Sequence, residues 1–169
     1  HRDITGRKQA EETLQNERRL FRTVIDLIPD AVYVKDTEGR KILANPKEVL
    51  IAGKNSEDEV IGKTDYTLYP DKEAKRALAQ EQLILNTGMP LLWDEGALVD
   101  KDGKLHWYSA SKVPLFDING KITGIVGVTH DITERRQVEE TLQNERRLFR
   151  TIIDLIPDGV YVKDTEGRK

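Results

Sequence analysis

Residues 131–157, DITERRQVEETLQNERRLFRTIIDLIP, decide the organisation of this chain, because nearly the same stretch has already occurred once. Residues 2–41 and 130–169 align at a constant offset of 128, and of the 40 aligned pairs all but six are identical. An internal repeat at a fixed period indicates repeated structural units along a chain. We therefore expect one globular unit between the two copies, in a chain that represents part of a tandem array.

The repeated stretch has the pattern of an amphipathic helix. Its apolar residues recur at alternating steps of four and three positions when Glu145 fills one gap, and the first copy repeats this spacing with Glu17 at the gap. Such spacing is typical of the a and d positions of a helix that pairs with another helix. We expect this helix to begin at Asp131, with Glu134 completing a start signal, and to end at Pro157. The predicted seam consists of Val138, Leu142, Phe149, Ile152 and Ile156.

The seam allows two arrangements, and the sequence leaves both open. Helices from two chains can pair through it, which predicts a homodimer through the flanking helices, or one apolar face can lie on its own domain. Residues 158–169 repeat the start of the first globular unit without the remainder of it. We expect this segment to be loosely ordered or to borrow a sheet edge from elsewhere.

Composition excludes several classes of protein. The 169 residues suit one domain with flanking segments, and the net charge of −3 comes from interspersed acidic and basic residues, which gives no basis for nucleic-acid binding. The absence of Cys excludes disulfides, thiolate metal sites and thiol catalysis. No run approaches eighteen apolar residues, so we expect no membrane contact within this chain and a cytoplasmic location, although the parent protein can be membrane-anchored.

Between the two helices the pattern predicts an antiparallel α+β domain. Strands are expected at 31–36 and 40–45, joined by a turn at 37–39, and three further strands at 91–100, 104–117 and 121–133. Asn45 and Pro46 are suited to cap and start a short helix. A second helical turn is expected to open at Thr64 or Asp65, and a longer helix at 70–86, ended by Thr87 and Gly88.

These segments carry a resemblance to a known family. GKTDYTLYP (62–70), HWYSASKVPLFDINGKITGIVGVTHDIT (106–133) and the closing Asp131-Ile132-Thr133 resemble a PAS sensor domain with flanking signalling helices, from a tandem-PAS signal-transduction protein such as a sensor histidine kinase. The resemblance implies a five-stranded antiparallel sheet with short helices on one face, flanked by N- and C-terminal amphipathic helices. It divides the chain into a linker helix (1–30), a PAS core (31–133), a C-terminal signalling helix (134–157) and the start of the next repeat (158–169).

The resemblance also implies which strand faces point toward a pocket. It places Leu92, Asp94, Gly96, Leu98, Tyr108, Ala110, Lys112, Ile125, Gly127 and Thr129 inward, and Trp93, Trp107 and Val113 on the opposite face, as a platform for the N-terminal helix or a partner. The candidate ligand-binding residues are Tyr33, Asp65, Tyr69, Asp94, Leu98, Tyr108, Lys112 and Thr129. Either Lys112 pairs with Asp94 or Asp65 and fills the interior, or these groups hold a small polar ligand. For Asp65 alone, capping a helix is the simpler role.

The resemblance predicts a non-catalytic sensory or regulatory module in which Asp131, Ile132 and Thr133 transmit the signal to a downstream PAS or effector domain. No cofactor is expected. The light-sensing flavin branch has a reactive Cys where this chain has residues 62–66, GKTDY, and the haem branches use a His on the long helix, where residues 70–86 contain none. Inward charges argue against non-covalent flavin, which leaves an unknown small ligand. The alternative is a ligand-free dimerisation or spacer module.

Overall fold

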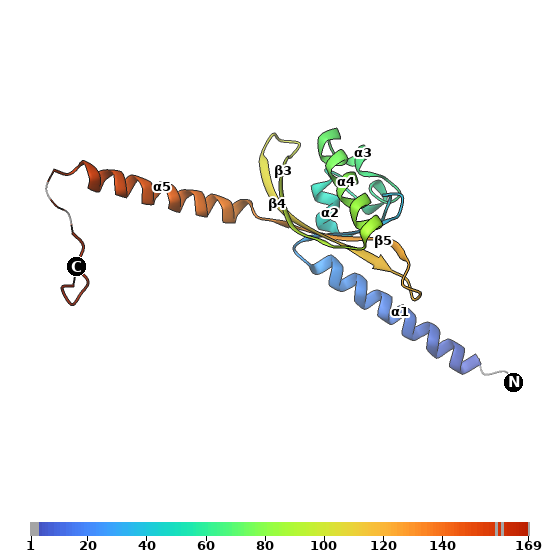
Figure 1. The fold of residues 1–169 in the computed structure, drawn as a ribbon. Helices are drawn as coiled ribbons and strands as arrows, with labels where there is room; N and C mark the ends of the chain where they lie inside the picture. The colour runs from blue at the N-terminus through green and yellow to red at the C-terminus, as the bar shows by residue number, and fades with distance from the viewer. Residues whose placement is uncertain (1–3, 158, 160, 169) are drawn as a thin grey trace. The chain divides into compact units, whose positions relative to one another are not determined.

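The structure, a computed structural model, describes residues 4–157, 159 and 161–168. Its elements divide between two compact units, residues 1–131 and residues 132–169. Figure 1 shows them as α1 (Ile4–Leu27), β1 (Ala31–Asp36), β2 (Lys41–Ala44), α2 (Pro46–Ile51), the 3₁₀ turn η1 (Glu57–Glu59), α3 (Asp65–Leu68), α4 (Asp71–Thr87), β3 (Leu91–Val99), β4 (Leu105–Phe116), β5 (Ile122–Asp131) and α5 (Thr133–Leu155). The first unit contains all of these except α5.

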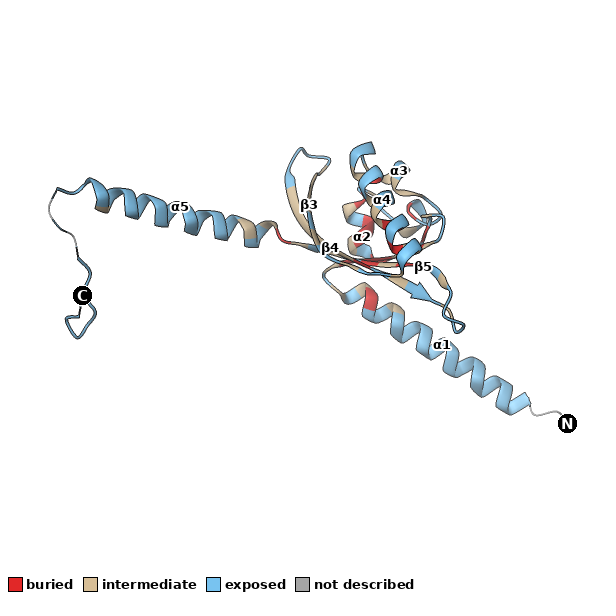
Figure 2. Ribbon diagram, viewed as in Figure 1, coloured by how far each residue is buried: buried red, intermediate tan, exposed pale blue. Residues whose placement is uncertain are grey.

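The predicted five-stranded antiparallel sheet is confirmed. Its strand order is β2-β1-β5-β4-β3, and every neighbouring pair is antiparallel. The helices α2, α3 and α4 lie over one face of the sheet (Figure 1). Buried residues gather between the sheet and these helices (Figure 2), where Ala44, Val49, Ala52 and Val60 form an apolar cluster against Leu68 and Tyr69.

Three sheet turns share one construction, an Asp followed three residues later by a Gly. In the first of them the Asp36 carboxylate accepts hydrogen bonds from the backbone N–H groups of Glu38 and Arg40, both at 2.9 Å, and Gly39 takes a φ of 79°. The same side-chain contacts and the same left-handed glycine recur at Asp100–Gly103 and Asp117–Gly120. Because only glycine adopts this conformation without a steric penalty, these positions terminate the strands at defined residues.

The repeat begins the same turn a fourth time, at Asp164–Gly167. The expectation for residues 158–169 falls partly on 158, 160 and 169, which lie outside the described residues. Among the described residues of this segment no strand is formed, and the turn is its regular feature. The local sequence therefore forms the turn without a sheet beside it.

Asn45 joins three elements of the first unit. Its side-chain oxygen accepts from the N–H groups of Glu48 and Val32, both at 3.0 Å, and its amide donates to the carbonyls of Ile25 at 3.0 Å and Asp30 at 2.9 Å. These four bonds use the full capacity of a buried amide. The predicted cap of α2 thereby also fixes the end of α1 and the start of β1.

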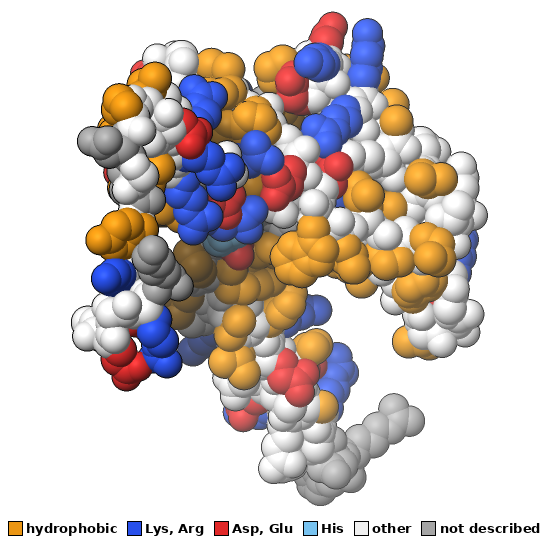
Figure 3. All heavy atoms as spheres, turned by 60° about the vertical axis from the view of Figure 1, so that its left-hand side comes forward, with side chains coloured by type: hydrophobic (Ala, Val, Ile, Leu, Met, Phe, Trp, Pro, Cys, Tyr) orange, Lys and Arg blue, Asp and Glu red, His pale blue; other side chains and the backbone are white. Residues whose placement is uncertain are grey.

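The two long helices are largely exposed along their length (Figure 2). The buried part of α1 lies at its C-terminal end, where Ile25 is 6% exposed. The predicted seam positions of α5 are all exposed, and Leu14, Phe21 and Val24 of the first copy are exposed as well. The space-filling view shows one face of the molecule, on which hydrophobic side chains lie beside groups of Lys and Arg (Figure 3). Among the described residues, neither these nor any other helix is long and apolar enough to cross a membrane.

The start of α5 lies within the predicted start signal, between Asp131 and Glu134. Asp131 is the last residue of β5, and the helix begins at Thr133, with Ile132 preceding it and accepting the N–H of Arg136 at 3.0 Å. The Asp131 carboxylate lies 3.5 Å from Nδ1 of His106 on the neighbouring strand β4. The helix ends at Leu155, two residues before Pro157.

Candidate functional site

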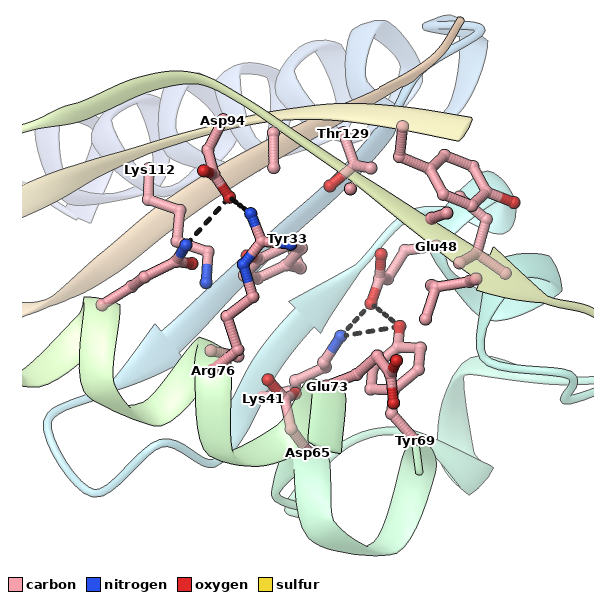
Figure 4. Close-up of a pocket in the computed structure, with 18 residues that line it drawn as sticks. Tyr33, Lys41, Glu48, Asp65, Tyr69, Glu73, Arg76, Asp94, Lys112 and Thr129 are labelled. Carbon is pink, nitrogen blue, oxygen red and sulfur yellow. Dashed lines mark hydrogen bonds and ion pairs between the residues drawn. The ribbon is translucent and has the colours of Figure 1, made fainter. Parts of the chain in front are cut away.

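A cavity of about 140 Å³ lies between the sheet and the short helices (Figure 4). Residues from all five strands form one wall, and residues from α2, α3 and α4 form the other. The structure brings all eight candidate residues to this cavity: Tyr33, Asp65, Tyr69, Asp94, Leu98, Tyr108, Lys112 and Thr129. Sequence reasoning missed several further lining residues, among them Lys41, Glu48, Glu73, Arg76 and Gln80.

The expected partner of Lys112 is wrong. Its ammonium group donates to Glu81 of α4 at 3.2 Å, while Asp94 and Asp65 pair with other cations. Glu81 also accepts from Lys35 of β1 at 2.6 Å, and Lys35 donates in addition to Asp65 at 2.6 Å. Two buried ammonium groups and two carboxylates therefore form one continuous chain of charge-assisted hydrogen bonds.

Asp65 is a member of this chain and not a helix cap. The residue at the cap position of α3 is Thr64, and Asp65 is the first residue of the helix. Its Oδ2 binds Lys35 at 2.6 Å, whereas its Oδ1 is buried with no hydrogen-bond partner among the described residues. A carboxylate with one unsatisfied oxygen beside a cavity offers an acceptor site to a donor group of a ligand or a water molecule.

A second buried group lies around Lys41, as Figure 4 shows. Its ammonium group donates to Glu48 of α2, and the Tyr69 hydroxyl donates to the same carboxylate oxygen at 2.7 Å. The ammonium nitrogen also lies 4.4 Å from the centroid of the Tyr33 ring, a cation–π contact. Burial lowers the pKa of Lys41 to about 7, and it raises the pKa of Tyr69 well above its usual value.

The buried charges balance within the two groups. Three lysines face three carboxylates: Lys35, Lys41 and Lys112, and Glu48, Asp65 and Glu81. Removal of charges from water costs several kcal/mol each, and pairing with further hydrogen bonds is what makes such burial tolerable. With all six groups ionised, the interior is therefore electrically neutral before any ligand enters, and the cavity remains.

Partly exposed side chains that line the cavity link α4 to β3. The Asp94 carboxylate of β3 accepts from Arg76 at 2.6 Å and from Gln80 at 2.8 Å, and Arg76 also donates to the carbonyl of Glu95 at 3.0 Å (Figure 4). These side chains are partly exposed, so each contact contributes little to stability.

A glycine of β5 makes room for the central aromatic ring. Tyr33 of β1 pairs with Gly127 of β5, and a Cβ built on Gly127 would lie 2.1 Å from the Tyr33 ring. The ring therefore lies directly over the backbone of β5. Burial raises the pKa of the Tyr33 hydroxyl well above its usual value, so it remains a neutral group in the cavity wall.

One residue expected to point inward does not. The register of β3 against β4 shifts between Leu91 and Asp94, and this bulge brings Leu91, in place of Leu92, opposite Lys112. Leu92 is 53% exposed and does not line the cavity. Trp93 lies in the bulge with a φ of 57° and is also exposed, so α1 does not cover it as a platform.

The sequence did contain a signal for Lys35 and Glu81, two buried charged residues that the sequence analysis did not single out. Lys35 follows Tyr33 by two positions on β1, so the two side chains lie on the same face of the strand. Any argument that turns Tyr33 inward therefore turns Lys35 inward as well. Glu81 lies seven residues after Ala74 and three before Ile84, and these three are the buried residues of α4. A single glutamate on a buried helix face predicts a buried cation opposite it.

The cavity reaches the C-terminal part of β5, the strand that precedes α5 in the chain. Thr129 lines the cavity two residues before Asp131, and Tyr108, which also lines it, pairs with Asp131 across β4 and β5. His106 lies at 2.9 Å from Asp100 and at 3.5 Å from Asp131, and its ring stacks with that of Tyr108 at 6.1 Å. The described residues contain no cluster of His and acidic side chains suited to hold a metal ion.

A five-stranded antiparallel sheet with helices over one face and a polar cavity between them defines a small α+β domain with a single sheet. The comparison with family models identifies it: residues 25–137 match the family described as PAS fold. The chain belongs to this family, as its sequence motifs predicted.

Relatives of known role are multi-domain signalling proteins. A diguanylate cyclase of Vibrio cholerae is 28% identical over 136 residues, which cover 79% of this chain and 42% of the cyclase. The virulence sensor protein BvgS of Bordetella parapertussis is 32% identical over 151 residues, covering 86% of this chain and 12% of BvgS. The chain thus spans less than half the length of these relatives. The solved PAS domain of Bordetella pertussis BvgS is 26% identical with a TM-score of 0.58, covering 79% of this chain and 98% of that domain.

Proposed function

We propose that this chain is a non-catalytic sensory module that binds a small polar ligand in the cavity and passes the bound state through α5 to a downstream domain. The observation that carries the proposal is the cavity of about 140 Å³ that remains after the buried charges are paired. An engineered cavity of about 150 Å³ holds one benzene molecule. A ligand of roughly six to eight non-hydrogen atoms matches this size.

The walls favour a neutral ligand with both donor and acceptor groups. Each buried ammonium group has a carboxylate partner, so a charged ligand would leave one protein charge without compensation. The unpartnered Oδ1 of Asp65 offers an acceptor, and the hydroxyl groups of Tyr108 and Thr129 offer donors. Small amides, lactams and hydroxylated six-membered heterocycles have this chemistry. The proposal includes no flavin or haem, as the sequence suggested.

The proposed route from cavity to helix is short. Tyr108 and Thr129 contact the cavity, and through β4 and β5 they adjoin Asp131, after which Ile132 and Thr133 lead into α5. A ligand changes this junction only if it binds two arrangements of the junction with different affinity. In this proposal the contacts that change are those of His106 with Asp100 and Asp131, which are partly exposed.

The protein that contains this chain is, in this proposal, a cytoplasmic or membrane-anchored signalling enzyme. The sensor protein and the cyclase among its relatives support this, because in each of them the matched region is less than half of the whole. The chain itself serves as the regulatory input in this proposal, with its catalytic output elsewhere in the protein.

Thermal denaturation against a panel of the named compounds tests ligand binding. A compound that binds only the folded form raises the midpoint by mass action, so at least one should do so. Ala110→Leu fills the cavity from β4 and should abolish the shift, whereas Ser109→Leu, next to it on the other face of the strand, should retain it. A panel that leaves the wild-type midpoint unchanged throughout, or a shift that survives Ala110→Leu, counts against the proposal.

The exposed seam supports a second candidate function, a spacer that sets the pairing of helices. In this version two chains associate through Val138, Leu142, Phe149, Ile152 and Ile156 of α5, all of which are exposed. Burial of apolar side chains at a and d positions is the driving force for such pairing. One chain can perform both functions. Ligand binding is the property that distinguishes a sensory module from a spacer.

A further inference from the structure

The C-terminal end of α1 shows how this repeated helix docks onto a PAS core. Arg22 donates to both carboxylate oxygens of Glu57, at 2.9 and 2.7 Å, and to the carbonyl of Ala44 at 3.3 Å. Ile25 is buried, and its carbonyl accepts the side-chain amide of Asn45 at 3.0 Å. A bidentate arginine–carboxylate pair next to a buried aliphatic residue fixes both the position and the rotation of the helix.

The end of α5 carries the same docking residues. At the offset of 128, Arg150, Ile153 and Asp154 correspond to Arg22, Ile25 and Asp26, and the segment LFRT-x-IDLIPD is otherwise identical in both copies. Arg150 and Asp154 are exposed in this structure, and Ile153 is half-buried at most. The residues that follow, 161–168, repeat β1 and its turn.

The arginine contact and the seam lie on different sides of the helix. At about 100° per residue, Arg22 and Asp26 lie roughly a third of a turn from the centre of the seam formed by Leu14, Phe21 and Val24, whereas the buried Ile25 lies only about 50° from it, at the edge of the seam. These seam residues remain exposed on α1 while Arg22 and Ile25 contact the core. Docking through Arg22 therefore leaves the seam residues Leu14, Phe21 and Val24 exposed to solvent or to another helix.

We propose that the last two turns of α5 are the docking surface for a further PAS core in the same protein, for which α5 serves as the N-terminal helix. The chemistry of the partner follows from the contacts of α1: a carboxylate at the position of Glu57 to receive Arg150, and a buried Asn at the position of Asn45 to bind the carbonyl of Ile153. In this arrangement one helix leaves the sheet of one core and sets the rotation of the next. The proposal does not depend on a ligand in the cavity.

The test uses the full chain and a tandem chain made from it. Residues 42–132 of this chain, appended after Lys169, supply the segment that follows Lys41 in the first repeat. In the tandem chain the amides of residues 150–155 should exchange with solvent at least about tenfold more slowly than in the 169-residue chain, because the helix end becomes held. Unchanged exchange would overturn the proposal. An appended segment that stays unfolded would also overturn it, because residues 130–169 would then be unable to serve the appended core as residues 2–41 serve the first one.

Substitutions give a matched comparison. In the 169-residue chain Arg22→Ala should lower the denaturation midpoint, whereas Arg150→Ala should leave it unchanged. In the tandem chain Arg150→Ala should restore fast exchange at residues 150–155, and reversal of the pair, Arg150→Glu together with Glu57→Arg in the appended core, should slow it again. Equal effects of Arg150→Ala on both chains, or protection that survives Arg150→Ala, would contradict docking through this arginine.

Discussion

Glu81 holds together the larger of the two buried charge groups, and Glu81→Gln tests that role. Its Oε1 accepts from Lys35 at 2.6 Å and from Lys112 at 3.2 Å, and all three side chains are nearly inaccessible to solvent. The substitution keeps the shape but leaves two buried ammonium groups facing the single carboxylate of Asp65. Loss of one partner from a buried ion pair costs about 3–5 kcal/mol.

That cost is a large part of the total stability of a domain, which is about 5–15 kcal/mol. In urea denaturation followed by circular dichroism, the midpoint should fall by about 1.5–2.5 M at the slopes usual for small domains. Glu81→Leu combined with Lys112→Met removes one charge of each sign and should return stability to within about 1 kcal/mol of the wild type. Glu73→Gln, on the same helix at a partly exposed position, should change it by only about 0.5 kcal/mol. A loss below about 1 kcal/mol for Glu81→Gln would refute the reasoning.

Three further predictions follow from the same geometry. Gly127→Ala places a methyl group against the Tyr33 ring and should destabilise the domain by about 1–3 kcal/mol in the same urea assay; an unchanged midpoint would contradict the close approach. The pKa of Lys41 is lowered to about 7 by burial, so the unfolded chain holds this proton to higher pH than the folded domain does. Stability should therefore rise between pH 7 and pH 10, by no more than about 1.4 kcal/mol per pH unit, and Lys41→Met should remove that slope; a slope kept in the variant would assign it elsewhere. Replacing Leu142 and Phe149 of the seam by Gln should convert a dimer into a monomer in light scattering, and an unchanged mass would exclude pairing through α5.

The sequence predicted the sheet because its local signals agree with one another. The turns at Asp36, Asp100 and Asp117 each place an Asp three residues before a Gly, and the alternating strands between them follow from that spacing. The repeat located the helices, since a near-identical stretch on either side of one globular unit marks both of its flanks. Local patterns of this kind need no knowledge of packing.

The partners of the buried charges lay outside the reach of these patterns. Lys112 was expected to pair with Asp94 or Asp65, but it pairs with Glu81 of α4. Which residues α4 turns toward the sheet depends on tertiary packing, which local patterns do not describe. Leu92 does not point inward because β3 has a bulge between Leu91 and Asp94, and no turn residue in the sequence indicates this bulge. Alternation along a strand predicts faces well, but one inserted residue reverses every face beyond it.

The central claim is that occupancy of the cavity changes the start of α5. Amide exchange at residues 133–137 tests it most directly, measured with and without a panel compound that raises the denaturation midpoint, and again in Ala110→Leu. The account predicts that the compound changes exchange at these amides by about threefold or more in the wild type and leaves them unchanged in the variant. A compound that protects the amides around the cavity while residues 133–137 exchange as before would contradict it.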